Sequence, residues 1–401
     1  MALVPVAEAL ERLLDGATAL PGESVPLAVA AGRVLAEPVV ALRTQPPFNA
    51  SAMDGYAARF ADVASVPARL SVIGMAPAGR GFIGLVGKGE AVRIFTGAPL
   101  PEGADTIVIQ ENVRDLGGGQ IEVTEPTSAG RNIRRAGLDF LRGDVLLAKG
   151  RLLDPAALSL AASANHPSLN VVRRPLVAII ATGDELLPPG SELGPDQIIS
   201  SNAYGVAAAA QSVGARALDL GIAPDRQDAI SALVKKAVDA SADVIVTLGG
   251  ASVGDHDLIH DVLTGEGMQL DLWKIAMRPG KPLMFGRLGD IRCIGLPGNP
   301  VASLVCSQLF LKPLLARLGG RLYRQDMRTA RLGAAMHAND LRQDYVRAVV
   351  REDAGQLIAT PFSIQDSSML RIIADANGLI VREPFAPAAE AGDECSVLML
   401  R

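Results

Sequence analysis

Residues Asp243–Leu248 read DVIVTL and run directly into Gly249-Gly250-Ala251-Ser252. A short, nearly continuous apolar run that ends in glycines is typical of a parallel strand buried on both faces. Pro175–Ala181 and Ile291–Leu296 have the same character. Helical patterns alternate with these runs over residues 202–213, 226–240, 255–264 and 300–318. The alternation predicts a doubly wound, mostly parallel sheet over residues 173–322.

Shorter elements flank this α/β region. Residues 1–20 show helical spacing, and Asp154-Pro155 is a typical helix start, with an N-cap and a proline at the first helical position. Strand-like runs lie at 67–73, 90–95, 105–110 and 119–124, and after residue 322 at 345–350, 356–360, 379–382 and 395–400. We interpret Asp353-Ala354-Gly355 as a hairpin turn and the arginine-rich stretch 321–331 as a linker or a solvated face.

Four domains follow from this pattern. We predict an N-terminal helical or linker domain that dimerises (1–42 and 140–172), an inserted small β domain (43–139), the α/β domain (173–322) and a C-terminal β domain (323–401).

The composition excludes several classes of protein. The 401 residues are 49% hydrophobic and 20% charged, which favours packed cores over disorder. A net charge of −5 argues against a nucleic-acid-binding face. No uninterrupted apolar run reaches the roughly 18 residues of a membrane span. The first residues also lack the basic segment followed by an apolar run that is typical of a secretory signal. Three cysteines and four histidines suggest neither a disulfide framework nor a zinc site, so we expect a cytoplasmic protein.

The ends of the predicted strands carry the chemistry, because ligands of parallel sheets bind at the carboxyl ends of the strands. Thr182-Gly183-Asp184-Glu185, Gly249–Asp257 and Pro297-Gly298-Asn299-Pro300 follow the three apolar runs, and the extended stretch Leu270–Met277 leads into Arg278-Pro279-Gly280-Lys281. Glycines let backbone amides approach an anion, and helix N-termini favour negative charge. The sequence therefore predicts an anion-binding crevice at this edge.

Charged residues of both signs accompany these turns. Lys274, Arg278 and Lys281 suit phosphates or an oxyanion such as molybdate. Carboxylates beside an anion are reasonable only with a divalent cation such as Mg²⁺, which bridges carboxylate and phosphate oxygens. Together they indicate phosphoryl or nucleotide chemistry.

Two motifs also have a purely structural interpretation. Asp225, with Asp228, could cap the helix over 226–240, and Asn299-Pro300 could begin the helix over 300–318. Outside the α/β domain, the loops 46–57 and 130–139 are either inter-domain turns or parts of the site. We favour a site role for Asp54, because Gly55 already permits the turn.

Six strings, in order, resemble the molybdopterin molybdenumtransferase family, which comprises the MoeA proteins and the related gephyrin E domain. They are NASAMDGYA (49–57), RIFTGAPLPEGAD (93–105), TGDEL (182–186), GGASVGDHD (249–257), MRPGKP (277–282) and LPGNPVAS (296–303). The resemblance implies insertion of molybdenum from molybdate into adenylylated molybdopterin, releasing AMP and the molybdenum cofactor, with Mg²⁺. It also implies a homodimer whose site lies between one subunit's α/β domain and its partner's inserted domain.

The resemblance also implies roles for individual residues. The catalytic residues would be Asp54, Asp139, Glu185, Asp225 and Asp257, of which Glu185, Asp225 and Asp257 would hold the metal. Substrate or anion binding would fall to Thr96, Gly249, Gly250, Ser252, Lys274, Arg278, Lys281, Ser303, Arg347 and Ser367. The sequence departs from the family pattern at Asp366, which stands where a glycine is usual, at Ala302-Ser303, where the serine comes one position late, and at Arg278, which replaces a lysine of some members.

Two other functions compete with insertion. One is the preceding step, adenylylation of molybdopterin, but the single-domain adenylyltransferases lack counterparts of residues 1–172 and 323–401. The other is a non-catalytic molybdopterin-binding scaffold, which could lose the acidic and basic site residues that this chain retains. The adenylyltransferase itself is an expected partner of the chain.

Overall fold

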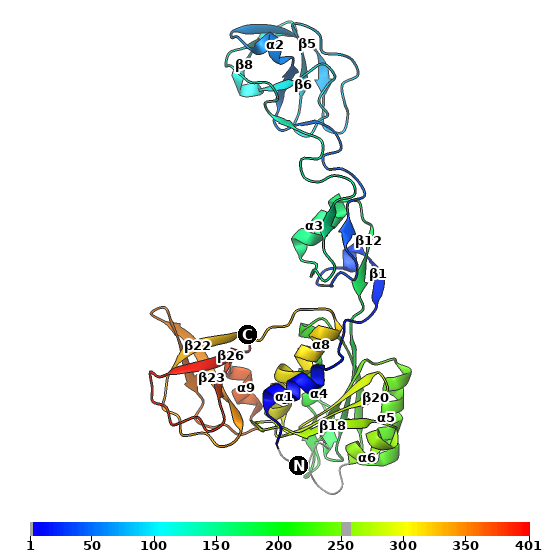
Figure 1. The fold of residues 1–401 in the computed structure, drawn as a ribbon, viewed down its shortest axis with the longest axis vertical. Coiled ribbons are helices and arrows are strands. Elements are labelled where there is room, and N and C mark those ends of the chain that lie inside the picture. The colour runs from blue at the N-terminus through cyan, green and yellow to red at the C-terminus, as the bar shows by residue number, and fades with distance from the viewer. Residues whose placement is uncertain (1–2, 250–257) are drawn as a thin grey trace. The chain divides into compact units, whose positions relative to one another are not determined.

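The computed structural model describes residues 3–249 and 258–401. The chain divides into two compact units. The first contains residues 1–23, 32–34 and 171–401, and the second contains residues 24–31 and 35–170. The chain passes from one unit to the other within β1 (Gly22–Pro26) and β12 (Ser168–Val172), which pair with each other (Figure 1).

The core of the first unit is a six-stranded sheet. In order across the sheet, its strands are β16 (Arg216–Ala223), β13 (Leu176–Thr182), β17 (Val244–Leu248), β21 (Ile291–Leu296), β20 (Pro282–Leu288) and β18 (Gln269–Lys274). The first four are parallel, whereas β20 is antiparallel to both β21 and β18. The end of β18 and the start of β20 therefore lie at the same edge as the carboxyl ends of the parallel strands.

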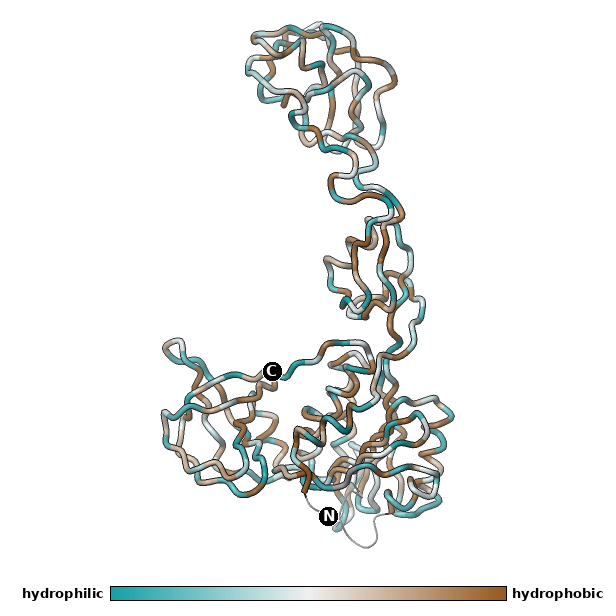
Figure 2. Tube along the Cα trace, viewed as in Figure 1, coloured by the Kyte–Doolittle hydropathy of each residue, from teal (hydrophilic) through white to brown (hydrophobic). Residues whose placement is uncertain are grey.

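Helices cover both faces of this sheet, as expected for strands with no polar face. On one face lie α1 (Val6–Leu14), α4 (Asn202–Ser212) and the continuous run of α7 (Pro300–Cys306), η3 (Ser307–Leu311) and α8 (Lys312–Leu318). On the other face lie α5 (Gln227–Asp239) and α6 (Leu258–Gly265). Hydrophobic residues concentrate in the sheet and in these helices (Figure 2). The predicted doubly wound α/β fold is confirmed.

The run Pro300–Leu318 is also the one helix, within the described parts of the chain, whose length and mean hydropathy would suit a membrane span. In this fold 78% of its apolar window is buried, as in the core helix of a globular unit.

A small β domain closes on itself after α8. Its strands, in order, are β19 (Met277–Arg278), β23 (Gln343–Asp353), β24 (Gln356–Pro361), β22 (Met327–Leu332), β26 (Glu394–Met399) and β25 (Gly378–Arg382), and β25 pairs again with β23. The predicted hairpin turn is present, because Asp353 pairs with Gln356 and the two residues between them have positive φ angles. The interpretation of 321–331 as a linker is wrong from Met327 onward, where β22 begins.

The second unit contains another six-stranded sheet. In order, its strands are β7 (Thr106–Ile109), β4 (Gly55–Ala58), β6 (Glu90–Ile94), β5 (Ala68–Ala76), β9 (Gln120–Val123) and β8 (Val113–Gly117), accompanied by α2 (Phe60–Val63). Of these, β5, β6, β7 and β9 match the strand runs predicted from the sequence, whereas β4 and β8 were not predicted. Two short pairs, β2 (Val39–Val40) with β11 (Val145–Leu147) and β3 (Ala50–Ser51) with β10 (Ile133–Arg134), precede the helix α3 (Pro155–Ser163). Asp154 caps α3 by accepting a hydrogen bond from the amide of Ala157.

Candidate functional site

A cavity of about 750 Å³ lies at the carboxyl edge of the α/β sheet. Turns that follow β13, β17 and β21 line it, together with the start of β20 and Ser368 of the C-terminal domain. Its lining includes Thr182, Gly183, Glu185, Ser200, Asn202, Asp225, Gly249, Pro282, Gly298 and Asn299. The predicted crevice is therefore present, and it is large enough for a nucleotide-sized ligand.

Glu185 turns back over the glycine that precedes it by two residues. Gly183 has a φ of +148°, and a Cβ atom there would lie 2.4 Å from Oε2 of Glu185. The Gly183 amide donates to the Ala223 carbonyl, at 3.2 Å, which ties this turn to the end of β16. Because Gly183 has no side chain, the Glu185 carboxylate can lie against it on the cavity wall.

Asp225 does not cap α5. The N-cap position belongs to Arg226, without a side-chain cap, and Asp228 is occupied by an ion pair with Arg226. Instead, the Asp225 amide donates to Oδ1 of Asp184, at 3.0 Å. The capping interpretation of Asp225 is wrong, and its side chain lines the cavity.

The acidic residues at this edge repel one another. Partial burial raises the pKa of Asp225, and the charges of Asp184 and Glu185 raise it further. A cation among these carboxylates would relieve that repulsion, and carboxylate oxygens are the ligands that Mg²⁺ prefers. Glu185 and Asp225 therefore fit a divalent cation, although residues 3–249 and 258–401 hold no cluster of three potential metal ligands. The third predicted ligand, Asp257, lies outside the described residues.

Of the glycine-rich turn after β17, the structure describes only Gly249, since Gly250 and Ser252 also lie outside the described residues. Gly249 has a φ of +94°, and a Cβ atom there would lie 2.9 Å from the Thr182 carbonyl oxygen. Its amide donates to the Leu296 carbonyl. Gly249 therefore allows close packing of two strand ends, and its own N–H is already used.

The third strand end connects the cavity to the C-terminal domain. Asn299 takes the N-cap position of α7, followed by Pro300, but its side chain makes no capping bond. Its Nδ2 donates to Oγ of Ser367 at 2.9 Å, and the Val301 amide donates to the Ser367 carbonyl at 3.0 Å. Asn299 thus begins the helix as predicted, while its amide group positions the predicted anion ligand Ser367.

The two predicted lysines reach this edge from neighbouring strands. Lys274 ends β18 and pairs in register with Pro282, and the Ile275 amide donates to the Lys281 carbonyl. Lys281, at the start of β20, is exposed. Their ammonium groups are thus attached to the strand end and the turn that border the cavity.

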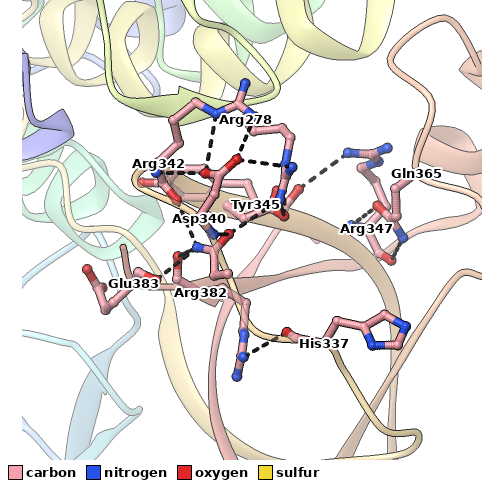
Figure 3. Close-up of polar contacts among 11 residues, drawn as sticks. Arg278, His337, Asp340, Arg342, Tyr345, Arg347, Gln365, Arg382 and Glu383 are labelled. Carbon is pink, nitrogen blue, oxygen red and sulfur yellow. Dashed lines mark hydrogen bonds and ion pairs between the residues drawn. The ribbon is translucent and has the colours of Figure 1, made fainter. Parts of the chain in front are cut away.

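Arg347 is a buried cation that lacks a full set of partners. Its side chain is 1% exposed, and its Nε has no hydrogen-bond partner. Its terminal nitrogens donate only long bonds, to the carbonyls of Tyr345 (3.5 Å) and Asp366 (3.4 Å). Burial lowers the pKa of this guanidinium. The backbone amide of Arg347 donates to Oε1 of Gln365, and Nε2 of Gln365 donates to the Arg347 carbonyl (Figure 3).

Two departures from the family pattern have a structural outcome. The carboxylate of Asp366 accepts hydrogen bonds from the amide and the hydroxyl of Ser368, at 2.8 and 2.6 Å, and the hydrogen bond from Arg347 goes to the Asp366 carbonyl. Ser303 is fully buried in α7, and its Oγ has no partner. Hydroxyl and guanidinium donors thus remain unpaired in this part of the molecule.

Arg278 is occupied by acidic residues of the C-terminal domain. Its Nη2 and Nε donate to Oδ2 of Asp344, at 2.7 and 3.1 Å, and its Nη1 lies 3.6 Å from Asp340 (Figure 3). The sequence could not identify these partners, which lie more than 60 positions away.

The remaining predicted residues, Asp54, Thr96 and Asp139, belong to the second unit. The amide and the hydroxyl of Thr96 both donate to Oδ1 of Asp54, at 2.8 Å, and these bonds lower the pKa of Asp54. The Asp139 amide donates to the Gln45 carbonyl at 3.0 Å. Asp54 and Thr96 are therefore brought together, and Asp54 is held ionised.

Sequence reasoning missed several residues of the cavity. Asn202 donates to the Gly298 carbonyl at 2.7 Å, and the hydroxyl of Ser368 donates to the carboxylate of Asp366. Asn202 follows Ser200-Ser201 at the start of a predicted helix, and this polar cluster was the available signal.

Family models cover most of the chain. Residues 4–165 match the MoeA N-terminal region (domain I and II), residues 178–317 a probable molybdopterin binding domain, and residues 329–400 the MoeA C-terminal region (domain IV).

Relatives and solved structures agree with these models. The molybdopterin molybdenumtransferase of Bacillus subtilis is 35% identical over 409 residues, covering 99% of this chain and 94% of the relative. That of Haemophilus influenzae is 34% identical over 381 residues, covering 94% and 93%. A crystal structure of the molybdopterin biosynthesis protein MoeA from Pyrococcus horikoshii matches with a TM-score of 0.86 and 31% identity, and the match covers 100% of both chains. A second crystal structure of MoeA from the same organism matches with a TM-score of 0.80 and 28% identity, covering 99% of this chain and 100% of that chain.

The raised pKa of Asp225 gives a first prediction. A carboxyl whose pKa is higher in the folded state stabilises the fold while protonated, and that stability is lost as the pH rises from about 3.9, its unfolded value, through the folded pKa. Asp225→Asn should therefore melt above the wild type at pH 7, and the difference should vanish below about pH 4. Asp228→Asn is the control of opposite sign, because Arg226 lowers the pKa of Asp228. Equal melting temperatures for Asp225→Asn and wild type at pH 7 would contradict the raised pKa of Asp225.

Proposed function

The chain belongs to the MoeA family of molybdopterin molybdenumtransferases, and on that premise we propose that it inserts molybdenum from molybdate into adenylylated molybdopterin, releasing AMP. The observation that carries this proposal is the 750 Å³ cavity in which strand-end glycines meet the carboxylates of Glu185 and Asp225. The N-termini of α4 and α7, which begin at Asn202 and Pro300 on the cavity wall, suit phosphate groups, whereas the carboxylates require a cation between themselves and a phosphate.

The chemistry requires two anions, the substrate's phosphates and molybdate, to come together. Lys274 and Lys281 lower the repulsion on one side of the cavity, and Arg347 with Ser367 offers donors on the C-terminal side. Mg²⁺ held by Glu185, Asp225 and Asp257 would supply charge neutralisation at phosphate oxygens during cleavage of the phosphoanhydride. Ser303, with its unpaired Oγ, completes the proposed set of donors.

We further propose that the protein is a cytoplasmic homodimer. Asp54, Thr96 and Asp139 lie in the second unit and the other proposed site residues in the first. In a two-fold symmetric dimer, the second unit of one protomer can supply Asp54 to its partner's cavity. The adenylyltransferase that makes the substrate is the proposed partner protein.

Removal of single site residues tests the reaction. Lys281→Ala and Asp257→Ala should each lose about 3–4 kcal/mol of transition-state stabilisation, by analogy with a lost oxyanion-hole donor. The measurement is molybdate-dependent release of AMP from adenylylated molybdopterin. Wild-type rates in both variants would refute the site assignment. Consumption of ATP with molybdopterin by the wild-type protein would instead indicate adenylylation, and binding without any turnover would indicate a scaffold.

Substitution of Arg347 is expected to weaken molybdate binding without lowering the stability of the fold. Burial of a guanidinium with an unpaired Nε is unfavourable for folding, so Arg347→Met should leave the free energy of unfolding unchanged or raise it. Molybdate affinity should nevertheless fall, because the main cation on the C-terminal side is gone. Urea unfolding and calorimetric titration with molybdate check both expectations. A less stable variant that binds molybdate like the wild type would contradict this role.

Subunit complementation tests the dimer. A mixture of Asp54→Asn and Lys281→Ala proteins, unfolded and refolded together, should recover about a quarter of the wild-type rate, since half of the dimers are mixed and each mixed dimer has one intact site. Asp225→Asn mixed with Lys281→Ala is the control and should recover nothing, because both changes lie in the same unit. Equal rates in the two mixtures would exclude a shared site.

A further inference from the structure

Three links join the C-terminal β domain to the edge of the α/β sheet. β19 pairs in parallel with the start of β23, where Met277 lies opposite Gln343 and Arg278 opposite Asp344. The Arg278 side chain then binds Asp344 through two nitrogens, and Nη2 also donates to Oδ1 of Asn339. Asn299, which lines the cavity, and Ser367 form the third link.

The charge around Arg278 is already balanced. Arg278 and Arg342 face Asp340 and Asp344, and Arg342 donates to Asp340 through its side chain and its backbone amide. These four side chains sum to zero charge, so an oxyanion gains little by approaching Arg278. Arg347 is different, because its donors reach only backbone carbonyls and the Asp366 carboxylate is bound to Ser368.

Asp344 and Arg347 lie on the same strand, three residues apart. A strand is stiff over such a distance, and Arg347 is itself fixed by its ladder to Leu379 of β25 and by Gln365. A restraint applied at Asp344 therefore also sets the position of Arg347 relative to the turn that carries Lys281. The bidentate fork of an arginine fixes both distance and orientation.

We propose that Arg278 is a positioning residue, which acts through Asp344 to fix the position of the incompletely paired guanidinium of Arg347, and that it does not bind the anion itself. The inference rests on the proposed function, since the anion in question is molybdate. Arg278 and Asp344 form a clasp between the two domains, and Asp340 and Asn339 orient the guanidinium within it.

A double-mutant cycle separates the clasp from a direct ligand. Arg278→Ala and Asp344→Ala should each raise the KM for molybdate roughly tenfold, the effect of one lost charge-assisted contact, with a smaller change in kcat. The double variant should be no worse than either single one. Arg278→Lys should recover part of the affinity. If Arg278 were a direct ligand, Asp344→Ala would leave the KM unchanged or lower it, because a cation would be released, and that result would overturn the proposal.

Hydrogen exchange provides a readout that does not depend on turnover. The Gln343 amide donates to the Ala276 carbonyl at 2.9 Å, across the junction of the two domains. Both single variants should speed exchange at residues 343–347 equally. Arg328→Ala is the matched control, since it breaks an exposed pair with Asp326 in the same domain and should leave this exchange unchanged. Unchanged exchange in both clasp variants would refute the clasp, whereas a wild-type protein without molybdate-dependent AMP release would refute the proposed function alone.

Discussion

The parallel pairing of β13, β17 and β21 is the constraint on which the rest of the structure depends. Val177 lies opposite Val244, and Val244 opposite Arg292, so the three strands end at the same height. Three loops far apart in the chain therefore meet at one edge. Because β13 and β17 are buried on both faces, a slip of register would leave their turns misaligned and gain no compensating polar contact. Burial of apolar side chains thus determines where the polar ones meet.

That arrangement leaves charged side chains whose interactions do not stabilise the fold. Asp184, Glu185 and Asp225 repel one another, and Arg347 is buried without a carboxylate bonded to it. Strands elsewhere in the chain show that the fold can satisfy such groups, since Arg173 and Asp243 form a two-bond pair beside β13. The mutual repulsion of the carboxylates supports the proposed binding of a cation at the cavity that Glu185 and Asp225 line, and the incompletely paired guanidinium of Arg347 supports the proposed binding of an anion.

Much of the fold could be predicted from sequence, because its signals are local. Apolar runs identified β13, β17 and β21, and Asp154-Pro155 marked the start of α3. The strands β16, β20 and β22 were missed for a shared reason. β16 is partly exposed, glycine interrupts β20, and the exposed positions of β22 include arginines, so none shows a clean apolar pattern. In the second unit, β5, β6, β7 and β9 were predicted because they are short runs between glycine-rich turns, whereas β4 and β8 were not.

The site was less predictable, because the role of a charge depends on the partners that the topology brings to it. Arg278 and Arg347 are the same residue type, and the family resemblance implies an anion-binding role for both. Arg278 extends from β19 beside β23, where Asp344 and Asp340 neutralise it. Arg347 lies on the face of β23 opposite to Val346 and Ala348, and its terminal nitrogens donate only to backbone carbonyls. A motif can place an arginine near a site, but only the tertiary contacts decide whether its charge remains available. The same argument removes Asp225 from its expected helix cap, since Asp184, which binds its amide, is 41 positions earlier in the chain.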